Sequence, residues 1–162
     1  FHNKKDLDKT KIPVYKTVSC FSVRRVKISR KLEYACRVMA QLGRYYERGN
    51  MVHIETLSTA EVIPSNYLVQ ILNELRLSGI IISKRGKQGG YALAKSPEEI
   101  TLSAIVEAVD SEFLKASYEN VGQSGAKVSK VWDTLRRKML EDLSSQTLDT
   151  LMSDDLGSMY YI

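Results

Sequence analysis

Apolar residues recur at steps of three and four from position 32 onward, which is the spacing of one face of a helix. They are Leu32, Ala35, Met39, Leu42 and Tyr46. Ser29 precedes the stripe, and its hydroxyl is a good N-cap acceptor for the first free backbone N–H groups. The pattern predicts a helix from Ser29 to near Gly49. Residues 1–27 hold neither helical nor strand periodicity, so we expect a flexible arm there.

Two shorter helices follow the first one. The second is predicted over residues 54–60, and Pro64 in the first turn favours the start of a third. Gly79 supplies the conformational freedom with which helices commonly end. The inward-facing residues of the third helix are predicted to be Leu68, Ile71, Leu72 and Leu75.

A β-hairpin is predicted directly after the third helix. The β-prone runs 80–85 and 91–94 flank a glycine-rich turn at 86–90. Two short helices joined by a tight turn and followed by a hairpin are the layout of a winged helix-turn-helix.

The last third of the chain predicts further helices. Thr101 is a suitable cap for a helix over 102–109, residues 111–126 form a polar connection, and a longer helix is expected over 127–144. The apolar stripe of that longer helix is Val128, Trp132, Leu135, Met139 and Leu143. Alternating steps of four and three are typical of a seam between two helices. Periodicity alone leaves open whether the stripe packs on its own domain or on a second copy. Residues 147–152 are predicted to add one last turn.

These elements predict a mainly α fold with a small β-hairpin. A length of 162 residues favours one winged helix-turn-helix domain with a long C-terminal helix attached. The predicted divisions are an arm at 1–27, the winged helix at 28–110, a connecting loop at 111–126, C-terminal dimerisation helices at 127–152 and a tail at 153–162.

Charge is distributed unevenly along the chain, whose net charge is +5. Residues 1–31 carry ten Lys and Arg against two Asp, and residues 64–95 carry five basic residues against one acidic. Residues 96–162 instead carry twelve acidic residues against six basic ones. The basic arm and middle of the chain therefore predict a polyanionic partner, and the acidic C-terminal third is a poor candidate for phosphate contact.

Double-stranded DNA is the partner that a winged helix fits. Its third helix suits the major groove, and its hairpin suits the adjacent minor groove. The candidate contacts are Ser65, Asn66, Tyr67 and Gln70 in the helix, and Lys84, Arg85, Gly86, Lys87 and Gly89 in the hairpin.

Individual side chains have distinct predicted roles at that surface. Gln70 can pair bidentately with adenine, Val69 can touch a thymine methyl group, and Arg85 suits a narrow minor groove because negative potential concentrates there. The alternative interpretation is that the helix side chains are ordinary solvated polar groups and that the hairpin glycines serve only the turn.

Four segments resemble one bacterial family. They are VKISRKLEYA at 26–35, IPSNYLVQILNELRLSGI at 63–80, RGKQGGYAL at 85–93 and PEEITL at 97–102. Together they resemble the Rrf-type regulators, which include the iron-sulfur cluster regulator, the nitric-oxide-sensitive repressor and the cysteine-metabolism repressor. The resemblance extends from residue 26 to about residue 152.

The resemblance implies a homodimer that binds a palindromic operator. The helix at 127–144 is then expected to cross its mate, which favours the dimer seam over packing on its own domain. Arg85 matches the wing arginine of the family, and the polar positions of the recognition helix match Ser65, Asn66 and Gln70. There are two departures from the family pattern: Val62 stands where a glycine is usual, and Val69 stands where some members have an acidic residue.

The cysteine content does not match that of cluster-binding members, in which the loop before the dimer helix supplies three cysteines. Residues 111–129 contain neither cysteine nor histidine, so we expect no metal and no cofactor. Cys36 is interpreted as a small buried residue of the first helix. Cys20 lies in the arm and gives only a weak redox signal.

These observations predict a cluster-free transcription regulator, most simply a repressor, that responds to a metabolite, a redox change or a protein partner. The alternative function is a winged-helix dimer that serves as a protein-interaction module and binds DNA without sequence preference. A third hypothesis, metal or cluster binding through Cys20 or Cys36, requires ligands that the sequence does not group together. No catalytic motif is present, so an enzyme is not predicted. The chain also lacks an apolar stretch long enough for a membrane span or signal peptide, and a cytoplasmic location is expected.

Overall fold

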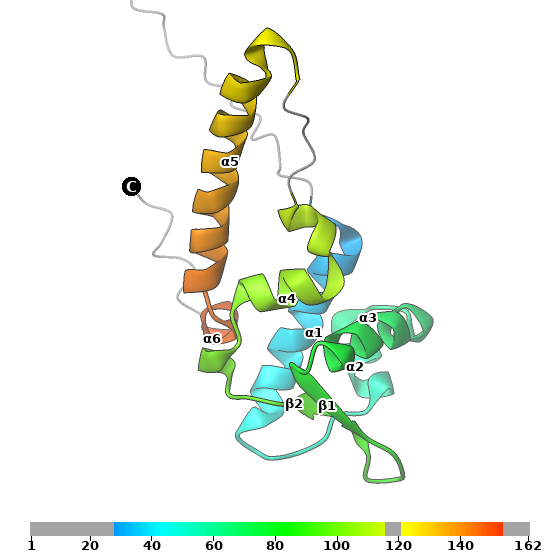
Figure 1. The fold of residues 1–162 in the computed structure, drawn as a ribbon. Coiled ribbons are helices and arrows are strands. Elements are labelled where there is room, and N and C mark those ends of the chain that lie inside the picture. The colour runs from blue at the N-terminus through cyan, green and yellow to red at the C-terminus, as the bar shows by residue number, and fades with distance from the viewer. Residues whose placement is uncertain (1–27, 116–120, 154–162) are drawn as a thin grey trace, which may run out of the picture.

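A computed structural model describes residues 28–115 and 121–153 of the chain. The predicted arm at 1–27 and nearly all of the predicted tail lie outside the described residues. The elements are α1 (Arg30–Tyr46), α2 (Ile54–Glu61), α3 (Ser65–Leu77), β1 (Ile81–Lys84), β2 (Gly90–Leu93), η1 (Pro97–Glu99), α4 (Leu102–Val109), η2 (Ser111–Leu114), α5 (Gly122–Ser145) and α6 (Leu148–Met152). The predicted mainly α fold with one small hairpin is confirmed (Figure 1).

Local capping chemistry sets two of the predicted helix starts. The Ser29 hydroxyl accepts a hydrogen bond from the backbone N–H of Leu32 at 3.2 Å, and the Thr101 hydroxyl accepts one from Ala104 at the same distance. Each bond satisfies an N–H group that has no partner inside the helix. α1 ends at Tyr46, three residues before Gly49, because a turn with Gly49 at φ +63° closes it.

α3 begins one residue later than predicted. Pro64 has extended backbone angles and occupies the N-cap position, so it lies just outside the helix and not in its first turn. The inward face is confirmed, because Leu68, Ile71, Leu72 and Leu75 are all buried. Gly79, at φ +77°, follows the C-cap as predicted.

The hairpin is antiparallel, and the segment between α1 and α2 pairs with its second strand. Ile81 pairs with Leu93 and Lys84 pairs with Gly90. β1 is therefore shorter than the predicted run 80–85, whereas β2 has the predicted length but begins one residue earlier than the run 91–94. Val52, between α1 and α2, exchanges two backbone hydrogen bonds with Tyr91 of β2, at 2.8 and 2.9 Å. This pairing holds the hairpin against the start of α2.

The C-terminal helix is longer than its sequence pattern predicts. α5 begins at Gly122, five residues before the predicted start at Lys127, and η2 occupies part of the predicted loop at 111–126. Gly122 and Gly125 are weak helix formers, so the sequence predicts that both lie in the loop. A helix already nucleated along its apolar stripe extends through Gly125, because each added residue adds a backbone hydrogen bond. It begins at Gly122, whose φ of +74° is a left-handed conformation that glycine adopts without steric cost.

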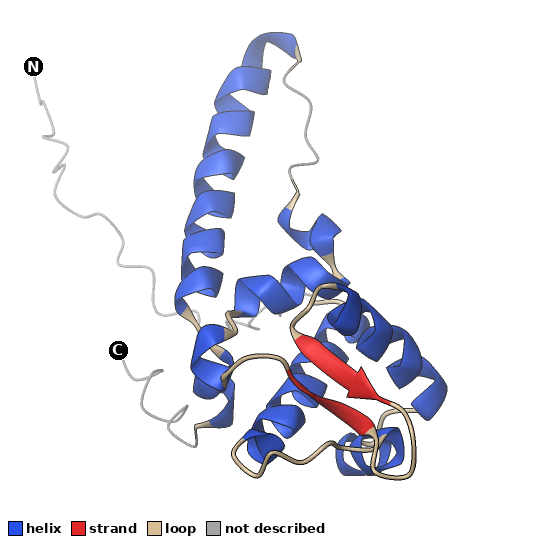
Figure 2. Ribbon diagram, turned by 60° about the horizontal axis from the view of Figure 1, so that its bottom comes forward, coloured by secondary structure: helices blue, strands red, loops and turns tan. Residues whose placement is uncertain are grey.

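A single core connects the winged helix to the C-terminal helices. Leu148 of α6 is fully buried, and its N–H donates to the Ile100 carbonyl at 2.7 Å, while the Leu102 N–H donates to Gln146 at 2.9 Å. α6 packs on α1, and the C-terminal end of α5 adjoins α4. The rest of α5 projects out of the domain on the side opposite the hairpin (Figures 1 and 2). Among the described helices, none is long and apolar enough to cross a membrane.

Candidate DNA-binding surface

α3 presents a polar face to solvent. Ser65, Asn66 and Gln70 are exposed, as predicted, and Val69 is exposed between them. The opposite face of α3 is buried in the core, so these side chains project from a helix that is held rigidly. A rigid helix suits base readout because little conformational entropy is lost when its side chains bind.

Tyr67 differs from the other predicted contacts on α3. Its ring is half-buried against the core and meets the Tyr34 ring of α1 edge to face, with ring centres 5.6 Å apart and planes at 87°. Such an aromatic pair stabilises the packing of one helix on another. Tyr67 therefore fixes the first turn of α3 against α1, and its contact with DNA stays a prediction.

The hairpin presents its basic residues at an exposed tip. Lys84, Arg85, Gly86 and Lys87 are all exposed, as a DNA contact requires. Gly89 is buried instead, and its N–H donates to the Gly86 carbonyl at 2.9 Å. A Cβ at Gly89 would collide with the Lys84 carbonyl oxygen, so this glycine is needed by the turn itself.

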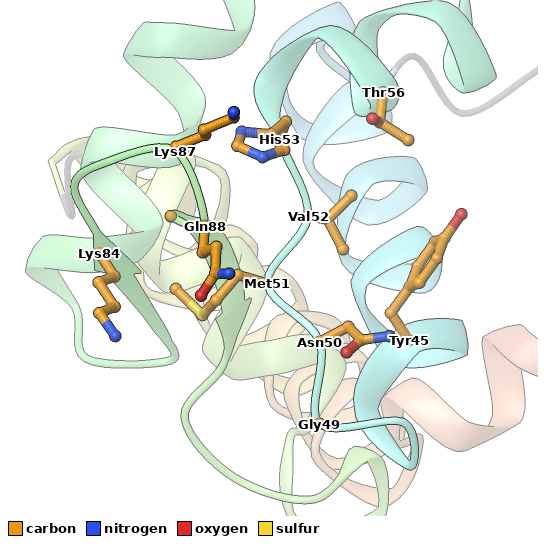
Figure 3. Close-up of a pocket in the computed structure, with 11 residues that line it drawn as sticks. Tyr45, Gly49, Asn50, Met51, Val52, His53, Thr56, Lys84, Lys87 and Gln88 are labelled. Carbon is orange, nitrogen blue, oxygen red and sulfur yellow. The ribbon is translucent and has the colours of Figure 1, made fainter.

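A concavity of about 610 Å³ lies between the hairpin and the start of α2 (Figure 3). Its lining includes Lys84 and Lys87 from the hairpin and Asn50, His53 and Thr56 from the other side, and it contains no carboxylate side chain. Basic and neutral donors around an open hollow suit a phosphate backbone. The sequence does not mark Asn50, His53 and Thr56 as part of this site, because only the long-range pairing of Val52 with Tyr91 brings them to the hairpin.

A second hollow, of about 360 Å³, adjoins the N-terminal end of α3. It is lined by Arg30, Tyr34, Pro64, Asn66 and Tyr67. α1 therefore adds an exposed cation, Arg30, and the ring of Tyr34 to the surface around the start of α3. In the sequence, Arg30 is marked only by its position directly after the Ser29 helix cap, and that position does not predict that Arg30 lies near α3.

Val62 occupies an unusual conformation in the turn between α2 and α3. It is the one described non-glycine residue with a positive φ, at 53°, and its side chain is 85% exposed. A β-branched residue in the left-handed region stores about 1–2 kcal/mol of strain. The valine therefore adopts a backbone conformation that glycine takes without steric cost.

The apolar stripe of α5 divides into two parts. Val128, Trp132 and Leu135 are each about half exposed, whereas Leu143 packs against the core of its own domain. Phe113 and Met139 join the first part in an open groove of about 460 Å³. The stripe thus packs on its own domain at its C-terminal end and remains exposed over the rest of its length.

Comparison with known proteins places this architecture in a family. Residues 28–154 match the Rrf2 family, described as an iron-dependent transcriptional regulator. This chain belongs to the Rrf2 family. It is 35% identical over 130 residues to an HTH-type transcriptional regulator of Mycobacterium tuberculosis, covering 76% of this chain and 79% of that one.

Two solved structures share the fold of this chain. CymR, the global cysteine regulator of Bacillus subtilis, superposes with a TM-score of 0.69 at 25% identity, over 79% of this chain and 97% of that one. IscR of T. potens gives a TM-score of 0.67 at 26% identity, over 85% and 93% of the two chains. This chain is therefore similar to a winged-helix transcription regulator along most of its length.

Iron is named in the family description, but the donor set here does not fit a thiolate-bound cluster. The whole chain has two cysteines, of which Cys20 lies outside the described residues and Cys36 lies in α1. Within the part of the chain that the structure describes, no three His, Cys, Asp or Glu side chains gather as metal ligands would. Clusters of this kind are held by several thiolates, so the residues of this chain do not fit one.

Cys36 is expected to be an unreactive thiol. Burial raises its pKa from 9.0 to about 11, and only the thiolate form is a good nucleophile. In a Cys20→Ser variant at pH 8, iodoacetamide should alkylate native Cys36 about a hundredfold more slowly than the same residue in urea-unfolded protein. Mass spectrometry of timed samples measures both rates. Equal rates would mean that the native thiol is open to solvent.

Proposed function

We propose that this Rrf2 protein is a sequence-specific, DNA-binding transcription repressor that acts as a homodimer on a palindromic operator. The observation that carries the proposal is the proximity of two surfaces: α3 packs against β1, so its polar face and the basic hairpin project from one rigid unit. Major-groove and minor-groove readers need that proximity because the two grooves adjoin along the duplex.

Each groove has a chemically suited reader. Ser65, Asn66 and Gln70 enter the major groove, where Gln70 can hydrogen-bond adenine through both atoms of its amide. Arg85 enters the minor groove at the tip of the hairpin. The concavity beside Lys84 and Lys87 accepts the sugar-phosphate strand that runs between the two grooves.

The exposed part of the α5 stripe forms the dimer interface. Val128, Trp132 and Leu135 leave apolar area open in the single chain, and a second copy of α5 offers the same stripe in return. Two winged helices joined in this way meet two operator half-sites related by two-fold symmetry.

The regulatory signal acts without a thiolate cluster. The sequence offers no cluster ligands in the segment before α5, so the signal is a metabolite, a redox change elsewhere in the chain or a protein partner. Such a protein belongs in the cytoplasm, where the DNA is, and it performs no catalysis.

Two substitutions test whether the hairpin contributes affinity for any DNA and α3 contributes the choice of base. Arg85→Ala should weaken binding to every DNA sequence and lower the slope of log affinity against log salt by about one. Gln70→Ala should instead relax the choice of one base pair, at a cost of about 1–3 kcal/mol on the operator. Fluorescence anisotropy on operator and scrambled duplexes over a range of salt concentrations measures both effects.

Lys138→Ala is the matched control, because Lys138 is an exposed cation on α5, far from the hairpin. This substitution should change neither the affinity for the operator nor the affinity for scrambled DNA. If wild-type protein binds operator and scrambled DNA equally, weakly and with strong salt dependence, the interaction-module alternative replaces the repressor. Its surface would then include the exposed apolar residues Val62 and Val69.

A further inference from the structure

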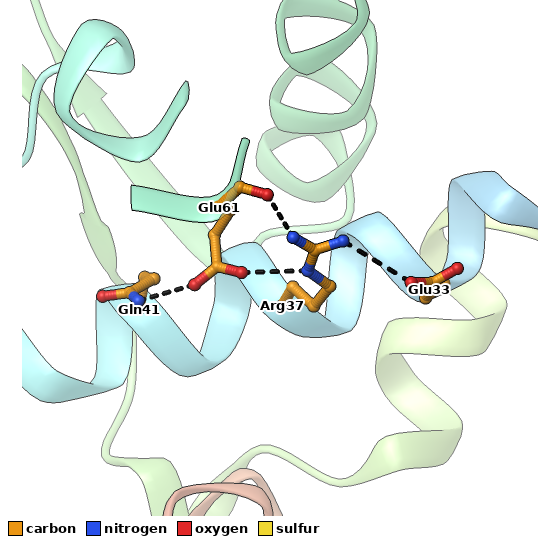
Figure 4. Close-up of polar contacts among 4 residues, drawn as sticks. All are labelled: Glu33, Arg37, Gln41 and Glu61. Atoms are coloured by element: carbon orange, nitrogen blue, oxygen red, sulfur yellow. Dashed lines mark hydrogen bonds and ion pairs between the residues drawn. The ribbon is translucent and has the colours of Figure 1, made fainter. Parts of the chain in front are cut away.

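A polar clamp ties the end of α2 to the side of α1 (Figure 4). Arg37 Nε donates to Glu61 Oε2 at 2.9 Å, and a second guanidinium nitrogen donates to the Glu61 backbone carbonyl. Gln41 Nε2 donates to the other carboxylate oxygen, Oε1, at 2.5 Å. We call these three residues the α1–α2 clamp. Both the side chain and the backbone of Glu61 are therefore held by α1.

The geometry of the clamp differs from that of an ordinary surface ion pair. The Glu61 side chain is only 15% exposed, and Arg37 grips it through two different nitrogens. The hydrogen bond with the Glu61 carboxylate raises the pKa of Arg37, whose guanidinium stays charged. By contrast, the pairing of Arg37 with Glu33 is long, at 3.5 Å, and exposed, so it contributes little.

The clamp acts on the residue next to the strained turn. Glu61 is the last residue of α2, Val62 follows in the left-handed conformation, and Pro64 is the N-cap of α3. Val62 is 85% exposed, so its own side chain has little packing to hold that conformation. Strained backbone persists only where surrounding contacts fix it, and the clamp supplies such contacts.

The same guanidinium also reaches toward α3. Arg37 lies over the Tyr34 ring, 5.5 Å from its centre, and that ring meets the ring of Tyr67 in the first turn of α3. One side chain of α1 is thus linked to both sides of the turn, to its beginning through Glu61 and to its end through Tyr34. A displacement of the turn would disturb both links together.

We propose that Arg37 is a positioning residue for base readout, which sets the angle and register of α3 by clamping Glu61. The proposal rests on the proposed function, because it concerns how α3 meets the operator. Contacts with phosphate tolerate small displacements of α3, whereas hydrogen bonds to base edges require accurate positions of donor and acceptor. Loss of the clamp should therefore lower sequence discrimination and leave non-specific affinity unchanged.

The test compares operator with scrambled DNA at a temperature where every variant is shown by circular dichroism to be folded. Arg37→Met should weaken operator binding about tenfold while scrambled-site affinity and salt slope stay as in wild type. Glu61→Gln keeps the shape of the side chain, should act in the same direction, and carries the test if Arg37→Met does not fold. Glu33→Gln is the matched control and should leave discrimination intact.

Rescue gives a readout that a merely structural role would not produce. Val62→Gly relieves the strain that the clamp opposes, so adding it to Arg37→Met should restore most of the lost discrimination. The proposal is overturned if Arg37→Met lowers both affinities equally, if discrimination survives, if rescue fails in folded protein, or if Glu33→Gln has the same effect. A wild-type protein without operator preference overturns the proposed function and this inference together.

Discussion

Trp132→Glu should convert the protein into a monomer and lower its apparent operator affinity by about a hundredfold or more. Trp132 is 55% exposed in the centre of the open part of the α5 stripe, and a carboxylate there would have to be desolvated in the dimer. Each winged helix would still fold and bind half of the operator, but the second half-site would no longer be reached at high effective concentration. Sedimentation velocity gives the oligomeric state, and anisotropy gives the affinity.

Lys130→Glu is the control for this substitution. It introduces the same carboxylate two residues away, which is roughly 200° around the helix and off the stripe. We expect this variant to remain dimeric and to bind the operator almost as well as wild type. A Trp132→Glu protein that sediments as a dimer with unchanged affinity would remove the α5 stripe from the interface.

Gly90→Ala should unfold the hairpin from the domain and cost roughly 3 kcal/mol or more of unfolding free energy. Gly90 has φ +136°, and an added Cβ would lie 2.5 Å from the Val52 carbonyl oxygen and 2.7 Å from its carbon. Both are backbone atoms in the pairing that holds the hairpin against the start of α2, so they cannot move away cheaply. Urea unfolding followed by circular dichroism measures the loss.

Gly86→Ala separates backbone strain from collision at this site. Gly86 also has a positive φ, of 108°, but no atom lies within 4 Å of the position that its Cβ would take. Its substitution should cost only about 1 kcal/mol. Similar losses for the two variants would mean that strain alone, and not the contact with Val52, makes glycine necessary at position 90.

Elements with local signals were predictable from the sequence. The cap at Ser29, the cap at Thr101 and the buried face of α3 depend on residues within one or two turns of each other, and all three are confirmed. Errors arose where a local rule competed with helix extension or with the exact cap position. The sequence predicts a loop at Gly122, where α5 in fact begins, and predicts Pro64 in the first turn of α3, where it is the N-cap instead.

Features built from distant residues were not predictable from the pattern. Arg37 and Glu61 are 24 residues apart, and no periodicity marks either of them as a partner of the other. The hollow beside the hairpin likewise depends on the pairing of Val52 with Tyr91. A glycine-rich turn and a DNA-contacting wing have the same composition, so the sequence predicts a DNA contact for Gly86 and Gly89 alike. Only the fold separates the exposed Gly86 from the buried Gly89.

Selection of binding sites from random duplex DNA tests the central claim most directly. Wild-type dimer at moderate salt should enrich a two-fold symmetric sequence whose half-sites are centred about 34–36 Å apart, or a multiple of that distance. An adenine contacted by Gln70 should be enriched in each half-site, and its enrichment should weaken in Gln70→Ala. If folded, dimeric protein enriches no sequence over the starting pool, this chain is not a sequence-specific regulator.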